Sequence, residues 1–177
     1  DIDGDDRTYI GKGVPDWSFG LNLSFEWKGI DFSMLLQGTV GNQVFNVTRR
    51  TDLYYINLPK TILNRWTGEG TSNTQPKFEF ASANDNYRSS DPWVEDGSFL
   101  RARNVQLGYT LPQKWTKKFF VQRLRIYAQA ENLFTLTKYT GCDPEVTGGN
   151  GFSSDLGVDR GVYPQSRTFS VGVNLNF

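Results

Sequence analysis

The sequence predicts an all-β fold whose antiparallel strands cross a membrane as part of a β-barrel, and three observations support this prediction. Apolar and polar residues alternate over stretches of about ten residues, the length of a membrane-crossing strand. Aromatic residues make up 15% of the chain, although only 37% of its residues are hydrophobic. Short and long connections alternate along the chain, as periplasmic turns and extracellular loops do in outer-membrane barrels.

The clearest alternation lies in residues 17–27, where every odd position is apolar and every even position is small or polar. A period of two is that of a strand with one apolar face. The same criterion predicts further strands near 30–40, 99–111, 123–136 and 168–177, with one exception at Leu35. Since five strands cannot close a barrel, this interpretation requires further strands upstream.

The connections support the same architecture. Lys28 and Gly29 form a two-residue turn, and residues 112–122 make a second short connection that holds the one predicted helical turn, near 114–120. The long segments 41–97 and 137–167 are predicted as extracellular loops.

The composition excludes several classes of protein. Lys and Arg number 19 and Asp and Glu number 19, so there is no basic excess for nucleic acid. The chain has no histidine and one cysteine, Cys142, which excludes His-based triads, imidazole zinc sites and an internal disulfide. No cofactor is expected. No signal peptide opens the chain, and no apolar run has the length of a membrane-spanning helix, so strands would have to do the crossing.

Two alternatives stay open. A soluble β-sandwich acting as a carbohydrate-binding module would also alternate, because one face of each strand is buried. A barrel-embedded enzyme could use Glu26 and Asp31 as an acid–base pair, but no substrate-positioning motif accompanies them, and no catalytic residue is assigned. Aromatic residues at the strand ends and a polar opposite face favour the barrel.

Several motifs along the chain resemble those of one known protein family. They are 65–70 (RWTGEG), 73–76 (NTQP), 94–101 (VEDGSFLR) with Asn104, 108–112 (GYTLP), 124–127 (LRIY), 131–141 (ENLFTLTKYTG), 143–145 (DPE), 163–165 (YPQ), 167–168 (RT) and 174–177 (NLNF). In these segments the sequence resembles the SusC/RagA-like TonB-dependent transporters of Bacteroidetes outer membranes. Cys142 departs from the pattern, since an aromatic residue is expected there.

The resemblance implies the C-terminal strands of a barrel of about 22 strands with a plugged lumen, in the cell outer membrane. It also implies import of oligosaccharides or peptides together with a SusD-like surface lipoprotein. Energy would come from TonB-ExbB-ExbD, through an N-terminal region that this chain lacks. The chain itself would supply wall strands and extracellular loops.

Two groups of candidate residues follow. Aromatic and acidic loop residues could bind a glycan, a peptide or the lipoprotein: Trp66, Tyr87, Trp93, Tyr139 and Asp143. The alternative is that such residues pack the long loops onto themselves. Polar strand positions are predicted to line the lumen, against the plug or water: Asn22, Ser24, Glu26, Asp31, Gln106, Arg125, Gln129, Glu131 and Asn174.

Other residues are predicted to face lipid. Trp17, Trp27 and Trp115 are expected at the membrane interfaces, and Phe177 at the end of a strand that serves barrel insertion or closure. Arg101 and Arg103 share the parity of Val105 and are expected to face outward, toward lipopolysaccharide phosphates. The alternative is that they extend to the membrane interface or pair with carboxylates of the loops.

The start of the chain carries alternating carboxylates, Asp1, Asp3 and Asp5, which resemble a calcium loop. The spaced glycine and closing glutamate of an EF-hand loop are absent, so a solvated acidic turn is the favoured interpretation.

Overall fold

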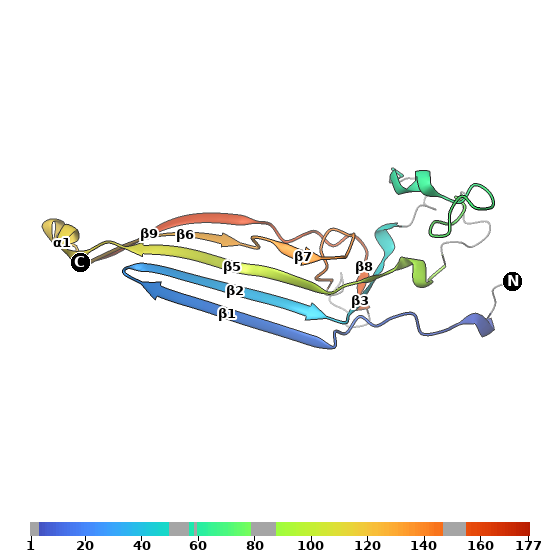
Figure 1. The fold of residues 1–177 in the computed structure, drawn as a ribbon, viewed down its shortest axis with the longest axis horizontal. Coiled ribbons are helices and arrows are strands. Elements are labelled where there is room, and N and C mark those ends of the chain that lie inside the picture. Colours follow the sequence, from blue (N-terminus) through green and yellow to red (C-terminus); the bar gives the residue numbers. More distant parts are fainter. Residues whose placement is uncertain (1–3, 50–56, 59, 79–87, 147–154) are drawn as a thin grey trace. The chain divides into compact units, whose positions relative to one another are not determined.

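The computed structural model describes residues 4–49, 57–58, 60–78, 88–146 and 155–177 (Figure 1). They belong to two units. The sheet unit comprises Pro15–Gly41, Gly97–Lys138 and Tyr163–Phe177, and the loop unit comprises Asp1–Val14, Asn42–Asp96 and Tyr139–Val162. Among the described residues, no helix is long and apolar enough to cross a membrane.

The sheet unit is one antiparallel sheet in the strand order β1-β2-β5-β6-β9, with β7 paired to β5 (Figure 1). The expected all-β fold is confirmed. Its elements are β1 (Trp17–Trp27), β2 (Ile30–Val40), β5 (Phe99–Thr110), β6 (Arg123–Glu131), β7 (Thr135–Thr137) and β9 (Thr168–Asn176). The strands β1 and β2 have 11 residues each, and β5 has 12, which is enough for a tilted strand to cross a bilayer.

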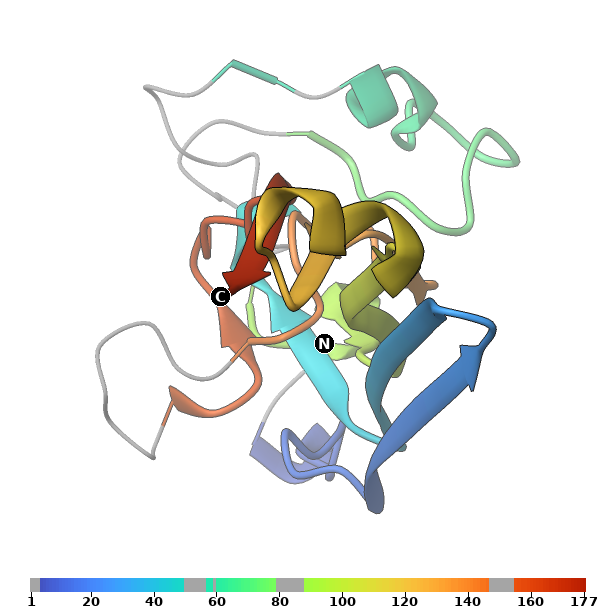
Figure 2. The ribbon, with the colours of Figure 1, turned by 90° about the vertical axis from the view of Figure 1, so that its left-hand side faces the viewer.

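Short connections gather at one end of this sheet, which Figure 2 views head-on. Lys28 and Gly29 have φ angles of 48° and 87°. Two consecutive positive φ angles are those of a type I′ turn, whose twist suits a two-residue hairpin. The connection from β5 to β6 holds a helical turn, α1 (Gln113–Thr116), continued by the 3-10 turn η6 (Lys117–Phe119).

The register gives the sheet an apolar face and a polar face. In β1 and β2, Leu21 lies opposite Leu36 and Phe25 opposite Phe32, whereas Ser24 lies opposite Ser33. The apolar side chains are exposed: Trp17 by 74%, Phe169 by 68% and Val171 by 80%. A sandwich would bury this face, so the exposed apolar surface argues against the soluble β-sandwich.

The strand expected near 123–136 is interrupted, and that prediction was wrong in its extent. β6 ends at Glu131, and Asn132 adopts a φ of 50°. Asparagine tolerates this left-handed conformation better than most residues. The chain then resumes as β7, which pairs with the segment Phe99, Leu100 and Arg101 of β5.

The outward placement of Arg101 and Arg103 was also wrong. Leu35 of β2 pairs with Asn104, but Leu36 pairs with Ala102, so Arg103 is an extra residue in β5. A β-bulge of this kind reverses the alternation beyond it. Arg101 therefore shares the polar face, is 3% exposed and donates to the Thr135 hydroxyl at 2.9 Å. Arg103 donates to the Gln37 side chain at 3.0 Å.

The loop unit has a small sheet of its own. β3 (Gln43–Asn46) pairs antiparallel with β4 (Val94–Asp96) and parallel with β8 (Val158–Asp159). Val44, Tyr139 and Val146 form its buried core, with Val162 packed against them. Short 3-10 turns complete the unit: η1 (Gly4–Asp6), η2 (Val47–Arg49), η3 (Lys60–Asn64) and η5 (Asp91–Trp93). The segments predicted as long loops are thus partly ordered by their own core.

Candidate functional site

The polar face of the sheet unit carries a continuous hydrogen-bonded chain of side chains. Arg125 of β6 forms an ion pair with Asp31 of β2, with its Nε 2.8 Å from Asp31 Oδ1 and its Nη2 bonded to Asp31 Oδ2. The same Nη2 donates to Gln106 at 3.0 Å, Gln106 donates to Gln129 at 3.3 Å, and Gln129 donates to Glu131 at 3.2 Å. Side chains from β2, β5 and β6 are therefore joined across this face.

A glycine makes room for the ion pair. Asp31 lies opposite Gly108 of β5, and Gly108 lies opposite Tyr127 of β6. A Cβ atom at Gly108 would lie 2.5 Å from Arg125 Nη2 and from Asp31 Oδ1. Because Gly108 has no side chain, Arg125 can reach over β5 to a strand that is not its neighbour.

Tyr127 extends this arrangement to the last strand. The guanidinium of Arg125 lies 4.9 Å from the centre of the Tyr127 ring, a distance suited to a cation–π interaction. On its other side Tyr127 covers Gly172 of β9, where a Cβ atom would meet the ring. Aromatic side chains laid over glycines compensate for the side chain that the glycine lacks.

The remaining lumen candidates lie on the same face. Asn22 borders a hollow of about 290 Å³, whose other lining residues are Ser33, Met34, Leu35, Asn104 and Gln106.

 Leu35, the exception in the alternation, faces this hollow between Asn22 and Asn104, next to the β-bulge. Glu26 lies opposite Asp31 at the hairpin end and is exposed. Since Asp31 is committed to Arg125, the two carboxylates do not form an acid–base pair.

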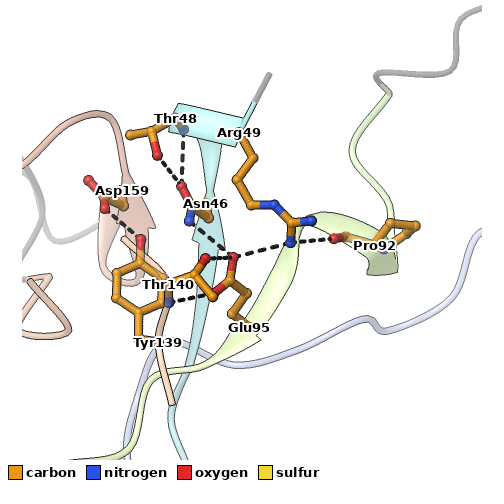
Figure 3. Close-up of polar contacts among 8 residues, drawn as sticks. All are labelled: Asn46, Thr48, Arg49, Pro92, Glu95, Tyr139, Thr140 and Asp159. Atoms are coloured by element: carbon orange, nitrogen blue, oxygen red, sulfur yellow. Dashed lines mark hydrogen bonds and ion pairs between the residues drawn. The ribbon is translucent and has the colours of Figure 1, made fainter. Parts of the chain in front are cut away.

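Glu95 organises the loop unit (Figure 3). Its carboxylate accepts hydrogen bonds from the Asn46 amide at 3.1 Å and from Arg49 at 3.2 Å. It also accepts from the backbone N–H and the hydroxyl of Thr140, at 2.8 and 2.9 Å. One side chain of β4 thus joins β3, η2 and the segment after β7.

The electrostatics of this cluster follow from its contacts. Burial alone would raise the pKa of Glu95, but the hydrogen bonds from Thr140 and Asn46 and the charge of Arg49 outweigh it and lower the pKa below its usual 4.5. Burial, with the hydrogen bond to Asp159, raises the pKa of the Tyr139 hydroxyl. Tyr139 therefore stays protonated and donates to Asp159 at 2.5 Å.

The candidate binding residues of the loops differ in their exposure to solvent. Tyr139 and Asp143 are buried, and Asp143 accepts a hydrogen bond from the Glu145 backbone at 2.9 Å. Trp93 is buried beneath Arg49, whose guanidinium lies 5.8 Å from the ring centre. Trp66 is 39% exposed. Tyr87 lies outside the described residues.

Trp66 borders a hollow of about 510 Å³ in the loop unit. Its lining residues are Trp66, Ser72, Asn73, Thr74, Gln75, Pro76, Lys77, Pro92 and Trp93. An aromatic ring beside amide and hydroxyl groups suits a ligand that has both apolar and polar surfaces.

The interface candidates are all exposed. Trp17 and Trp27 lie at opposite ends of β1, Trp115 lies in α1, and Phe177 follows β9. Asp1 and Asp3 lie outside the described residues, whereas Asp5 lies in η1. Within the part of the chain that the structure describes, no group of three acidic or thiol side chains could hold a metal ion.

Comparison with known proteins shows which proteins the chain is similar to. No protein-family model matches the chain. The chain is 32% identical over 188 residues to TonB-dependent receptor P3 of Formosa agariphila, an alignment that covers 100% of this chain and 18% of that receptor. It is 29% identical over 178 residues to TonB-dependent receptor SusC of Bacteroides thetaiotaomicron, covering 99% of this chain and 16% of SusC.

Solved structures agree. A structure of the RagAB peptide transporter matches with a TM-score of 0.80 and 28% identity, over 100% of this chain and 19% of that chain. The RagAB peptide importer in an open-open state matches with a TM-score of 0.75. The chain spans less than a fifth of the length of these relatives.

The two-faced antiparallel sheet and these similarities define a portion of a TonB-dependent receptor barrel. The chain belongs to the SusC/RagA-like family, and its strands correspond to the C-terminal part of the barrel. The relatives are receptors and transporters, which agrees with the expectation that the chain is not an enzyme.

Sequence reasoning missed the residues that connect the site. Their positions in the alternation predicted that Arg125 and Asp31 both lie on the polar face. Their contact also requires the missing side chain of Gly108 on the strand between them, which alternation does not predict. Glu95 was missed as an organising residue because its partners Asn46 and Thr140 lie 49 and 45 positions away.

Proposed function

We propose that this chain supplies wall strands and extracellular loops to an outer-membrane importer driven by TonB-ExbB-ExbD. The observation that carries the proposal is the exposed apolar face of the sheet unit, opposite a polar face joined by the Asp31–Arg125 pair. Apolar surface of this extent is unfavourable in water, at roughly 25 cal/mol per Å², and favourable against lipid chains. The polar face then lines the lumen.

The cargo we propose is an oligosaccharide or a peptide, taken up together with a SusD-like surface lipoprotein. The kinship to SusC and to the RagAB peptide importer supports this proposal. Within the loop unit, Trp66 is the accessible candidate for contact with cargo or lipoprotein. Tyr139, Asp143 and Trp93 stabilise the loop from within.

Lipid exposure along β1 tests the wall assignment. Nitroxide labels are attached to single cysteines introduced one at a time at residues 19–25 of the full-length receptor in lipid vesicles, after its native cysteines, Cys142 among them, have been replaced by serine. Oxygen, which concentrates in lipid, is expected to relax the labels at Phe19, Leu21 and Leu23 more than those at Gly20, Asn22 and Ser24. A profile without a period of two would refute the membrane wall.

Uptake by cells tests the transport assignment. Deletion of the full-length gene is expected to abolish uptake of one class of cargo, oligosaccharides or peptides, with restoration by the intact gene. Unchanged uptake of both classes would contradict the proposal.

A further inference from the structure

The connection between β5 and β6 gathers positive charge on one helical turn. Lys114 lies in α1, and Lys117 and Lys118 lie in η6. Their spacing of three and four residues places the side chains next to one another on one face of the turn. All three lysines are exposed, and among the residues that the structure describes their amines form no hydrogen bond or ion pair. Since neighbouring ammonium groups repel one another, this arrangement favours an anionic partner.

The anion is not supplied by the segment itself. No Asp or Glu occurs in residues 97–130 of the sequence. Lys28, in the hairpin that is hydrogen-bonded to the end of β5, adds a further positive charge. The acidic residues at this end of the sheet unit are Glu26 and Asp31, which both lie on the polar face, and Asp31 is paired with Arg125. The lysines of the turn are therefore open to an anion from outside the chain.

Two aromatic side chains of the same connection are also exposed. Trp115 is 61% exposed and Phe120 is 89% exposed. Phe120 also has a φ of 60°, a left-handed conformation that glycine most often takes at the end of a helix. A phenylalanine at this position is unfavourable in water on both counts. It is favourable against the acyl chains that lie next to lipid headgroups.

The turn lies just beyond the end of the lipid-facing surface (Figure 1). Tyr109 and Ile126, on the apolar face, are paired near the ends of β5 and β6. The Leu111 N–H donates to the Leu124 carbonyl at 2.9 Å, and the helical turn begins two residues later, at Gln113. In a barrel whose apolar face meets acyl chains, the next segment lies in the headgroup layer, which is roughly 5–8 Å thick. Lipid phosphates occupy that layer.

We propose that residues 113–120 bind an anionic phospholipid of the periplasmic leaflet, with the three lysines around its headgroup phosphate. This inference rests on the proposed function, because it requires strands that cross a membrane. A lipid of net negative charge fits better than phosphatidylethanolamine, whose own ammonium group would compete with the lysines for the phosphate. An anionic polymer of the cell wall would offer no apolar phase to the two exposed aromatic side chains.

Selective quenching by spin-labelled lipids tests the inference. A fluorophore is attached to Gln113→Cys in the full-length receptor, whose native cysteines have been replaced by serine, and the receptor is placed in phosphatidylcholine nanodiscs. Phosphatidylglycerol and phosphatidylethanolamine, each carrying the same nitroxide on an acyl chain, are added separately as a minor component. We expect phosphatidylglycerol to quench more strongly, because each lysine beside an anionic lipid favours binding by about fivefold. Added salt is expected to reduce the difference.

Substitution of the lysines shows whether they cause the preference. Glutamine at all three positions, Lys114→Gln, Lys117→Gln and Lys118→Gln, should make the two lipids quench equally. Arginine at the same three positions is the matched control and should keep the preference, because it keeps the charge. Lys117→Gln alone, for which we expect about a fivefold loss of preference, is the second variant should the triple glutamine variant fail to assemble.

Three outcomes would overturn the inference. They are equal quenching by the two lipids when all three lysines are present, a preference that the glutamine variants retain in full, and binding to isolated peptidoglycan in place of the lipid preference. Folding in the outer membrane is measured on the same receptor by its heat-modifiable migration. A receptor that is folded there but shows no lipid preference refutes the phospholipid site and leaves the importer standing.

Discussion

Gly20 and Gly108 both lie on the polar face of the sheet unit, but the space above them differs. A Cβ atom at Gly20 would have only the Leu36 carbonyl oxygen near it, at 4.0 Å. At Gly108 it would overlap Arg125 and Asp31. Comparing the two glycines therefore tests whether Gly108 leaves room for the Asp31–Arg125 pair.

Gly108→Ala is expected to lower the stability of the barrel by about 1–3 kcal/mol, because the added methyl group displaces the Asp31–Arg125 pair. The matched change Gly20→Ala should be neutral or stabilising, since alanine restricts the unfolded chain and meets no clash. The measurement is the apparent unfolding temperature of the full-length receptor in detergent. Equal shifts for the two variants would show that Gly108 does not make room for the pair.

Among the elements, Glu95 holds three segments of the loop unit together. Glu95→Gln keeps the shape of the side chain but removes its charge and places an N–H group against the hydrogen-bond donors that now face the carboxylate. The free energy of unfolding of the loop unit should therefore fall by about 1–3 kcal/mol. Hydrogen exchange of β3, β4 and the segment 139–146 is expected to quicken. Glu69→Gln, an exposed position in the same unit, is the control. Unchanged exchange would contradict the organising role of Glu95.

The stability of the loop unit should depend on pH, because the pKa of Glu95 is lowered in the folded state. The folded pKa lies below the unfolded value of 4.5, so the stabilisation is full above that value and is lost as the pH falls through the folded pKa. Protection of the loop unit, corrected for the intrinsic exchange rate, should therefore fall in acid below about pH 4.5. Glu95→Gln should flatten this acid response. A response of the same size in the variant would assign it to other groups.

The strands show what alternation predicts and what it misses. The expected strands 17–27 and 30–40 have the bounds observed for β1 and β2, because a period of two and a glycine turn are local signals. The bulge at Arg103 and the break at Asn132 depend on pairing with other strands, which alternation does not show. Extending the period of two across the bulge therefore assigned Arg101 to the wrong face. The polar-face candidates could be predicted by parity, whereas the hydrogen bonds that join them could not.

For the whole molecule, the two faces of β1 predict opposite tolerance to charge. Leu21 is central in β1 and exposed on the apolar face, and Asn22 follows it on the polar face. Leu21→Arg should cost about 2–4 kcal/mol at the bilayer midplane. Asn22→Arg should be tolerated, because its side chain faces the hollow lined by Ser33 and Asn104. The fraction of full-length receptor that is folded in the outer membrane, read from its heat-modifiable migration, should fall for Leu21→Arg and hold for Asn22→Arg. Loss of both variants alike would mean that charge is excluded from both faces, which a lumen-lining polar face does not allow.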